Sequence, residues 1–314
     1  MKLALRLFIN VITVIAIMLL LEVACRITLH YVYNRSFDSS LIIDNKYFTS
    51  SGLKENAEGT VWGKKFHTDA LGCRKNKAPL DAKKKKWLFI GDSVTEGVGV
   101  EDNETFSSLC SEELKDYSVL NCSLIGYSTN DYLNVLTHYL NTDSTVELVT
   151  VFFCLNDVYG SAKSDSLPVM AQSGATTAAR NFLQEHYATY KLLKLFMFRN
   201  ANRYFQYDAA YYTADNARFK ESMNYLYLCD SLCKARGIYF NVVMMPYRSQ
   251  LTEDKGNRTP QQMVAEYCSS NGIEFFDAVD NLAKEKQPEA LFLFADEIHF
   301  SAEGHKAIAR FLLQ

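Results

Sequence analysis

The segment Trp87–Gly97, WLFIGDSVTEG, decides the fold because it joins a short apolar run to a glycine-bounded turn. Four apolar residues that stop abruptly at glycine are typical of a strand buried within a sheet. Gly91 and Gly97 permit a tight turn that presents Ser93 to solvent. The segment therefore predicts a buried strand with a serine at its carboxyl end.

Strand and helix patterns alternate after this segment. Further strands are predicted at residues 118–121, 146–153, 238–245 and 273–276. Helices are predicted at 105–115, from a capping Thr129 to about Leu140, and at 217–235, 260–270 and 302–313. This alternation predicts an α/β fold with a five-stranded, mainly parallel sheet.

The stretch from about 158 to 215 interrupts the alternation. It is rich in alanine and tyrosine and contains one predicted helix at 178–198. Because ligands bind beyond the carboxyl ends of the strands in such sheets, we interpret this stretch as an insertion or lid over those ends.

The amino terminus predicts a membrane anchor. Lys2 and Arg6 precede an uncharged run from Leu7 to Leu21, and apolar residues continue beyond Glu22, which is long enough for a transmembrane helix. A cleaved signal peptide and a lipoprotein modified at Cys25 are alternatives, but Glu22 stands where both favour another residue type. We therefore expect an uncleaved single-pass helix with a cytoplasmic amino terminus.

These patterns predict three parts. Residues 1–29 form the anchor, 30–81 a stalk with an irregular lead-in, and 82–314 the main domain, which lies on the extracytoplasmic side, periplasmic or extracellular.

Composition excludes several classes of function. The 33 basic and 36 acidic residues give a net charge of −3, so nothing indicates a nucleic-acid partner. The eight cysteines lack the paired spacing of a zinc site, and we expect most of them to be small buried residues. No metal or organic cofactor is expected.

Polar residues follow three of the predicted strands, and two more precede the last helix. Ser93, the segment Asn121–Gly126 and Asn156 stand at strand ends, while Asp296 lies three residues before His299. A serine becomes nucleophilic when a histidine takes its proton, and a carboxylate fixes the tautomer of that histidine. Backbone amides of Ser93 and Gly126 and the Asn156 side chain are candidate donors to an oxyanion.

With these motifs the sequence resembles the SGNH/GDSL hydrolase superfamily from about Trp87 to Leu313. The four matching blocks are Gly91-Asp92-Ser93 with Thr95 and Gly97, Asn121 through Gly126, Asn156-Asp157, and Asp296-x-x-His299. The resemblance implies a flavodoxin-like three-layer sandwich. It also implies Ser93 as nucleophile, His299 and Asp296 completing a triad, and Gly126 and Asn156 in the oxyanion hole.

The amino-terminal helix and the segment Phe66–Arg74 resemble those of membrane-anchored bacterial members of the superfamily. One position departs from the pattern, because Cys154 stands where the third block usually has glycine. A larger side chain there is expected to narrow the pocket or tilt Asn156.

The expected function is hydrolysis of ester-linked acyl groups, above all acetyl groups on cell-envelope or extracellular carbohydrate. The expected partners are therefore an acylated small molecule or polysaccharide and, through the amino-terminal helix, a membrane. Two alternatives remain open: an O-acyltransferase that uses the same triad, and a catalytically inert carbohydrate-binding or scaffold protein.

Overall fold

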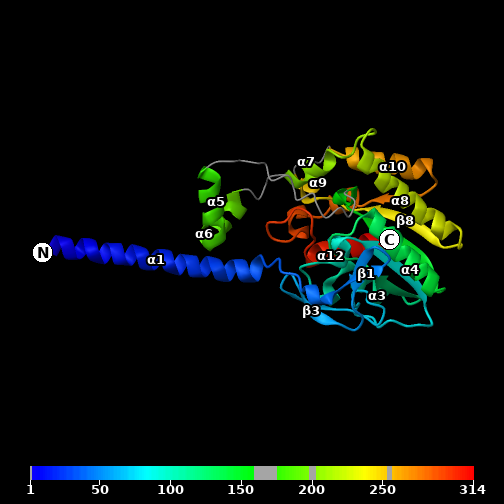
Figure 1. Cartoon of the computed structure of the whole chain (residues 1–314), viewed down its shortest axis with the longest axis horizontal. Helices are drawn as coiled ribbons and strands as arrows, with labels where there is room; N and C mark the ends of the chain where they lie inside the picture. Colours follow the sequence, from blue (N-terminus) through cyan, green and yellow to red (C-terminus); the bar gives the residue numbers. More distant parts are fainter. Residues whose placement is uncertain (1, 159–174, 198–202, 253–256) are drawn as a thin grey trace. The chain divides into compact units, whose positions relative to one another are not determined.

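The computed structural model describes residues 2–158, 175–197, 203–252 and 257–314 (Figure 1). Two compact units share the chain. The smaller comprises Met1–Arg35 and Lys163–Ala201, and the larger comprises Ser36–Ala162 and Asn202–Gln314.

A five-stranded parallel sheet forms the centre of the larger unit. Its strands lie in the order β6-β5-β7-β8-β9. Their bounds are Lys85–Gly91 for β5, Tyr117–Asn121 for β6, Val146–Phe153 for β7, Tyr239–Met244 for β8 and Glu274–Asp277 for β9. The predicted α/β fold with a five-stranded sheet is confirmed.

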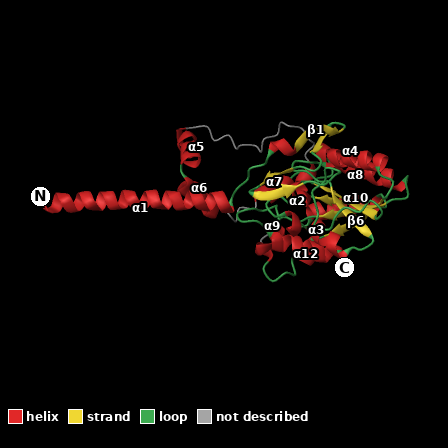
Figure 2. Cartoon of the chain, turned by 90° about the horizontal axis from the view of Figure 1, so that it is seen from below, coloured by secondary structure: helices red, strands yellow, loops and turns green. Residues whose placement is uncertain are grey.

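Helices cover both faces of this sheet. Successive residues of a strand point to opposite faces, so each strand contributes side chains to the packing on both sides. Leu88 and Ile90 of β5 pack in one apolar cluster with residues of α4 and α8, whereas Phe89 packs in a second cluster with residues of α3 and α12. Figure 2 shows these helices in red around the yellow strands. The helices are α3 (Phe106–Glu113), α4 (Thr129–Thr142), α8 (Ala217–Lys234), α10 (Thr259–Ser270) and α12 (Ala302–Leu312).

Four short helices also occur among the described residues of the larger unit. They are α2 (Ser93–Glu96), α7 (Arg203–Ala209), α9 (Arg248–Thr252) and α11 (Val279–Leu282), and single 3-10 turns occur at Ser39–Leu41, Asp102–Glu104, Leu155–Val158 and Pro288–Leu291. The cap of α4 differs from the prediction. Ser128 caps this helix in a capping box with Asp131, and Thr129 is the first helical residue.

The smaller unit contains α1 (Lys2–Val32), α5 (Ala175–His186) and α6 (Ala188–Met197). Within the segment Leu3–Tyr31 of α1, an 18-residue window has a mean hydropathy of 2.6, and the helix fits a single-pass anchor or a signal sequence. The prediction of a single helix at 178–198 is wrong in one respect, because the helix is interrupted at Tyr187 and the structure has the two helices α5 and α6.

The lead-in folds with the larger unit from Ser36 onward. It forms two antiparallel hairpins, β1 (Ile42–Tyr47) with β2 (Ser50–Leu53) and β3 (Glu58–Val61) with β4 (Lys64–His67). Apolar residues of these hairpins, among them Tyr47, Val61 and Phe66, belong to the same buried cluster as Leu88 and Ile90. The lead-in therefore adds to the main core.

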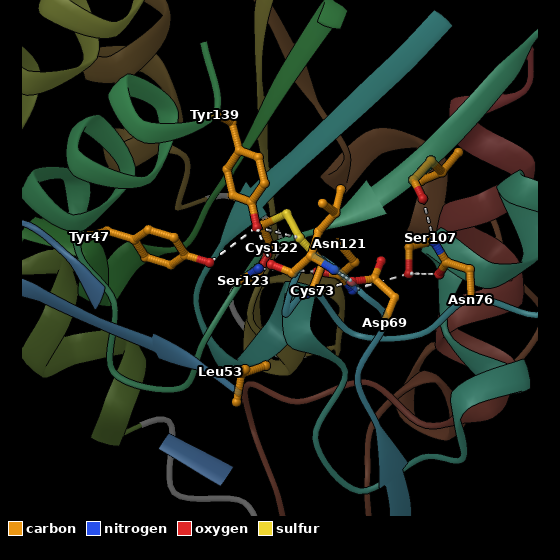
Figure 3. The surroundings of a disulfide bond; sticks show 12 residues. Tyr47, Leu53, Asp69, Cys73, Asn76, Ser107, Asn121, Cys122, Ser123 and Tyr139 are labelled. Carbon is orange, nitrogen blue, oxygen red and sulfur yellow. Dashed lines mark hydrogen bonds between the residues drawn. A yellow bond between two sulfur atoms is a disulfide. The ribbon is translucent and has the colours of Figure 1, made fainter. Parts of the chain in front are cut away.

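A disulfide between Cys73 and Cys122 joins the lead-in to the residue that follows β6 (Figure 3). Beside it, the Tyr139 hydroxyl of α4 is hydrogen-bonded to the Tyr47 hydroxyl and donates to the Leu71 carbonyl. The other six cysteines are buried and reduced. The expectation that most cysteines are small buried residues holds for these six, but no pattern in the sequence indicated the bonded pair.

We expect Cys73→Ala/Cys122→Ala to lower the free energy of unfolding. The bond closes a loop across a sequence separation of 49 residues, for which chain entropy gives about 4 kcal/mol. Denaturant unfolding with and without a reductant measures the effect. Reductant should destabilise the wild type and leave the double variant unchanged, so equal sensitivity of the two proteins would contradict the prediction.

Candidate active site

The turn after β5 fixes the position of Ser93. The Asp92 carboxylate accepts the Val94 backbone N–H at 2.9 Å and so caps α2, whose first residue is Ser93. Gly97 ends this helix in the left-handed region with φ +82°, a conformation that favours glycine. At Gly91 a Cβ atom would lie 2.1 Å from Thr95 Oγ1, so the close packing of the turn also requires glycine there.

The loop before α12 brings His299 to Ser93. Ser93 Oγ lies 2.9 Å from His299 Nε2. On the other side of the ring, Nδ1 lies 3.1 Å from both carboxylate oxygens of Asp296. Asp296 Oδ1 also accepts the backbone N–H groups of Ile298 and His299 at 2.8 Å, which closes the loop around the carboxylate. This arrangement places a proton on Nδ1 and leaves Nε2 to accept the serine proton.

A second histidine of the same region, His305, has a structural role. It is buried in α12, and its Nδ1 accepts the Phe106 backbone N–H at 3.2 Å. Burial, with smaller contributions from Arg74 and His299, lowers the pKa of His305 to about 3, so this ring remains neutral in the core.

Gly126 lies in the loop after β6. Its φ of +83° requires the left-handed region, and a Cβ atom there would meet nothing within 4 Å. Glycine is therefore needed for its backbone conformation and not for a close approach. The preceding amide, Ile125 N–H, donates to the Glu96 carboxylate at 2.8 Å. Burial raises the pKa of Glu96 to about 8, against the opposing effect of Arg74.

Asn156 follows β7 and lies between two buried groups. Its side-chain amide donates to Asp92 Oδ2 at 3.2 Å, while the Tyr247 hydroxyl lies 3.2 Å from Asn156 Oδ1. The same hydroxyl lies 2.5 Å from Asp208 Oδ2, a carboxylate of α7. Burial raises the pKa of Asp208 to about 7, although its hydrogen bond from Tyr247 acts in the opposite direction. Tyr247 and Asp208 were not singled out by the sequence analysis.

Cys154, which stands where the third block usually has glycine, lies in a turn that is held by hydrogen bonds to its backbone. Its N–H donates to Asp157 Oδ2 at 2.7 Å, and the Asp157 N–H donates to the Cys154 carbonyl. Asp92 and Asp157 thus both hold turns through backbone hydrogen bonds.

Two residues of the lead-in also reach the site. Arg74 is fully buried and donates to the carbonyl oxygens of Glu96, Gly97 and Val100, which follow the Ser93 turn. The Trp62 ring contacts the His299 ring edge to face, with centroids 4.5 Å apart. Arg74 lies in the segment Phe66–Arg74 noted in the sequence, but neither residue was assigned a role there, because each acts through a contact distant along the chain.

The groups gathered here suit acyl transfer. A serine, a histidine and a carboxylate form one hydrogen-bonded line, and backbone amides and an asparagine lie at the neighbouring strand ends. Among the described residues, no group of three or more His, Cys, Asp or Glu side chains is placed to hold a metal ion.

Comparisons with known proteins agree with this chemistry. Residues 89–307 match the model of the GDSL-like lipase/acylhydrolase family. No curated protein matches the chain.

Solved structures with similarity to the chain include three hydrolases. A lipolytic G-D-S-L protein from Veillonella parvula is 14% identical, with a TM-score of 0.43 over 73% of this chain and 96% of that one. The acetylxylan esterase Axe2 from Geobacillus stearothermophilus is 16% identical, with a TM-score of 0.43 over 73% and 92%. A lipase/acylhydrolase from Enterococcus faecalis is 14% identical, with a TM-score of 0.43 over 73% and 93%.

The family model runs from the end of β5 through β9 and includes the turn that carries Ser93 and the loop that carries His299. The chain therefore belongs to the GDSL-like lipase/acylhydrolase family and is an ester-hydrolysing serine hydrolase.

Proposed function

We propose that the chain is a membrane-anchored esterase that removes acetyl groups from cell-envelope or extracellular carbohydrate through a Ser93–His299–Asp296 triad. The observation that carries the proposal is the continuous hydrogen-bonded line from Asp296 through His299 to Ser93, at 3.1 and 2.9 Å.

In the proposed reaction His299 Nε2 takes the Ser93 proton as Oγ attacks the ester carbonyl. The resulting oxyanion accepts hydrogen bonds from the Ser93 and Gly126 amides and from Asn156. The intermediate collapses to an acyl-enzyme, and His299 gives its proton to the departing alcohol. Water, deprotonated by the same histidine, then releases the acid and restores Ser93.

Two features support a small acyl group on a sugar. Cys154 is buried beside Asp92 and is larger than the glycine usual at that place, so we expect it to narrow the space for an acyl chain. Trp62 contacts the ring of His299, and an aromatic ring in that place offers an apolar surface to a sugar ring.

Two further features support an extracytoplasmic site. Lys2 and Arg6 precede the apolar run of α1, which favours a cytoplasmic amino terminus. The Cys73–Cys122 disulfide is of the kind that persists in oxidising compartments. Acylated polysaccharides of the cell envelope are accessible from that side.

Ser93→Ala should abolish labelling by a fluorophosphonate probe and lower kcat/KM for acetylated xylo-oligosaccharides by at least about 10³-fold, because the nucleophile is lost. Ser231→Ala in α8 is the matched control and should behave like the wild type. Labelling of Ser93→Ala at the wild-type level would contradict the triad. Equal turnover of acetyl and hexanoyl esters by the wild type would contradict only the preference for acetyl.

Tyr247→Phe should lower kcat about tenfold and leave KM nearly unchanged. The phenol hydroxyl holds Asn156, and an oxyanion contact acts mainly in the transition state. Steady-state kinetics on a soluble acetyl ester separate the two constants. A rise in KM with unchanged kcat would show that Tyr247 serves substrate binding instead.

The protonation state of Asp208 should make the contribution of Tyr247 to kcat depend on pH. A phenol has one hydrogen, so Tyr247 donates either to Asn156 or to an ionised Asp208. Below its pKa of about 7, the neutral Asp208 carboxyl can donate to the phenol oxygen and leave the phenol hydrogen for Asn156.

We therefore expect kcat to fall as pH rises through about 7 in the wild type. Asp208→Asn can donate to Tyr247 at every pH, so its kcat should lack this fall. Parallel pH profiles of kcat measure the difference, and coincident profiles would exclude the proposed role of Asp208.

A further inference from the structure

We propose that α5 and α6 lie in the lipid–water interface of the membrane, so that the chain contacts the bilayer a second time in the middle of its sequence. This proposal rests on the anchoring of α1 proposed above. It assigns the helical hairpin α5–α6 (residues 175–197) a lipid surface as its partner.

Glu22 connects the hairpin to α1. Its carboxylate accepts the backbone N–H groups of Ala188 and Thr189 at 2.8 and 3.0 Å and the Thr189 hydroxyl at 2.5 Å. These groups form the first turn of α6, whose backbone N–H groups have no partner within the helix. Glu22, the one acidic residue of α1, thus caps α6, and its charge is satisfied beside an apolar helix.

The contact lies near the carboxyl end of α1. Besides Glu22, Cys25 is only 7% exposed, and Leu29 is partly buried at the next helical spacing. Arg26 pairs with Glu22 at 2.9 Å and donates to the His186 carbonyl at 2.7 Å, at the end of α5. The hairpin therefore packs beyond the uncharged run Leu7–Leu21. Charged groups at this place in a spanning helix mark the membrane interface, so the hairpin lies at the same level.

The composition of the hairpin fits that level. Its charged side chains are predominantly basic, with Arg180, Lys191 and Lys194 against the single acidic Glu185. Large apolar side chains of the hairpin are not covered by other described residues. Their exposed fractions are 52% for Phe182, 38% for Leu183, 48% for Tyr187, 56% for Leu193 and 54% for Phe196. Aromatic and aliphatic residues on helices whose charges are basic are typical of segments that lie in the interface of anionic membranes.

A bilayer is favoured over a protein partner because of continuity with α1. None of the described residues buries the apolar window of α1, and the exposed apolar side chains of α5 and α6 belong to the same unit. One medium, the lipid, then covers the apolar surfaces of all three helices.

Tryptophan fluorescence in liposomes tests the proposal with the full chain. Leu193→Trp and Phe182→Trp report on the hairpin, Ile12→Trp reports on the anchor, and Tyr239→Trp is an exposed control in the larger unit. Each variant is reconstituted in phosphatidylcholine–phosphatidylglycerol liposomes with normal or 6,7-brominated acyl chains. The parent emission of Trp62 and Trp87 is subtracted.

The added emission at 193, 182 and 12 should fall by at least about half in brominated lipid, because side chains of an interfacial helix reach the upper acyl region. At 239 it should fall by less than about a tenth, the level expected far from the acyl chains. Quenching at 12 without quenching at 193 and 182 would overturn the proposal and leave the anchor intact. Quenching at none of these three positions, or equal quenching at 239, would also overturn it.

The link through Glu22 is tested in the same liposomes by Glu22→Ala and Glu22→Gln. Loss of the cap in Glu22→Ala should speed hydrogen exchange of the Ala188 and Thr189 amides at least about tenfold, whereas glutamine, which still accepts hydrogen bonds, should restore part of the protection. Unchanged exchange in Glu22→Ala would contradict the docking of α6 on α1. Esterase activity of each variant is measured separately, so failure of the membrane proposal is distinguishable from failure of the catalytic one.

Discussion

The buried guanidinium of Arg74 is the interaction on which the geometry of the site depends. Burial lowers its pKa, and the nearby Asp102 and Glu96 carboxylates oppose that shift. A buried charge left without partners costs several kcal/mol, so its donors must meet acceptors. They meet three carbonyl oxygens of residues 96–100 and the Asp102 carboxylate. The turn that carries Ser93 is thereby fixed to the lead-in, which precedes it in the sequence. The lead-in is also joined to the residue after β6 by the Cys73–Cys122 disulfide.

The sheet and the strand-end residues could be predicted because both follow from local patterns. The run Val146–Phe153 is apolar apart from Glu147 and Thr150, and the structure has a strand with the same bounds. Carboxyl ends of parallel strands lie at one edge of a sheet, so Ser93 and Asn156 had to be neighbours. Periodicity alone did not identify Asp296 and His299 as a pair. Their roles were predicted from the order of the family's motifs along the chain.

The remaining features depend on contacts distant along the chain. Cys73 and Cys122 pair because Arg74 lies in an isolated antiparallel bridge with Asn121, a register that no spacing in the sequence encodes. Trp62 occupies a left-handed turn with φ +51°, which is rare for such a residue and leaves no periodic signal. The break at Tyr187 likewise has no signal in the sequence, since the apolar pattern of 178–198 continues through it, and in the structure the first turn of α6 is hydrogen-bonded to Glu22 of α1.

The contact between Asn156 and Asp92 is compatible with the proposed oxyanion role. A side-chain amide has two hydrogens, and the bond to Asp92 Oδ2 uses one of them. When Tyr247 donates to the carbonyl end of the same side chain, the second hydrogen has a fixed direction. The backbone of the turn is held independently by the hydrogen bonds between Cys154 and Asp157. Cys154 therefore lies in a turn that is held by backbone hydrogen bonds, and in the proposed function its side chain bears on the size of the acyl group beside Asn156.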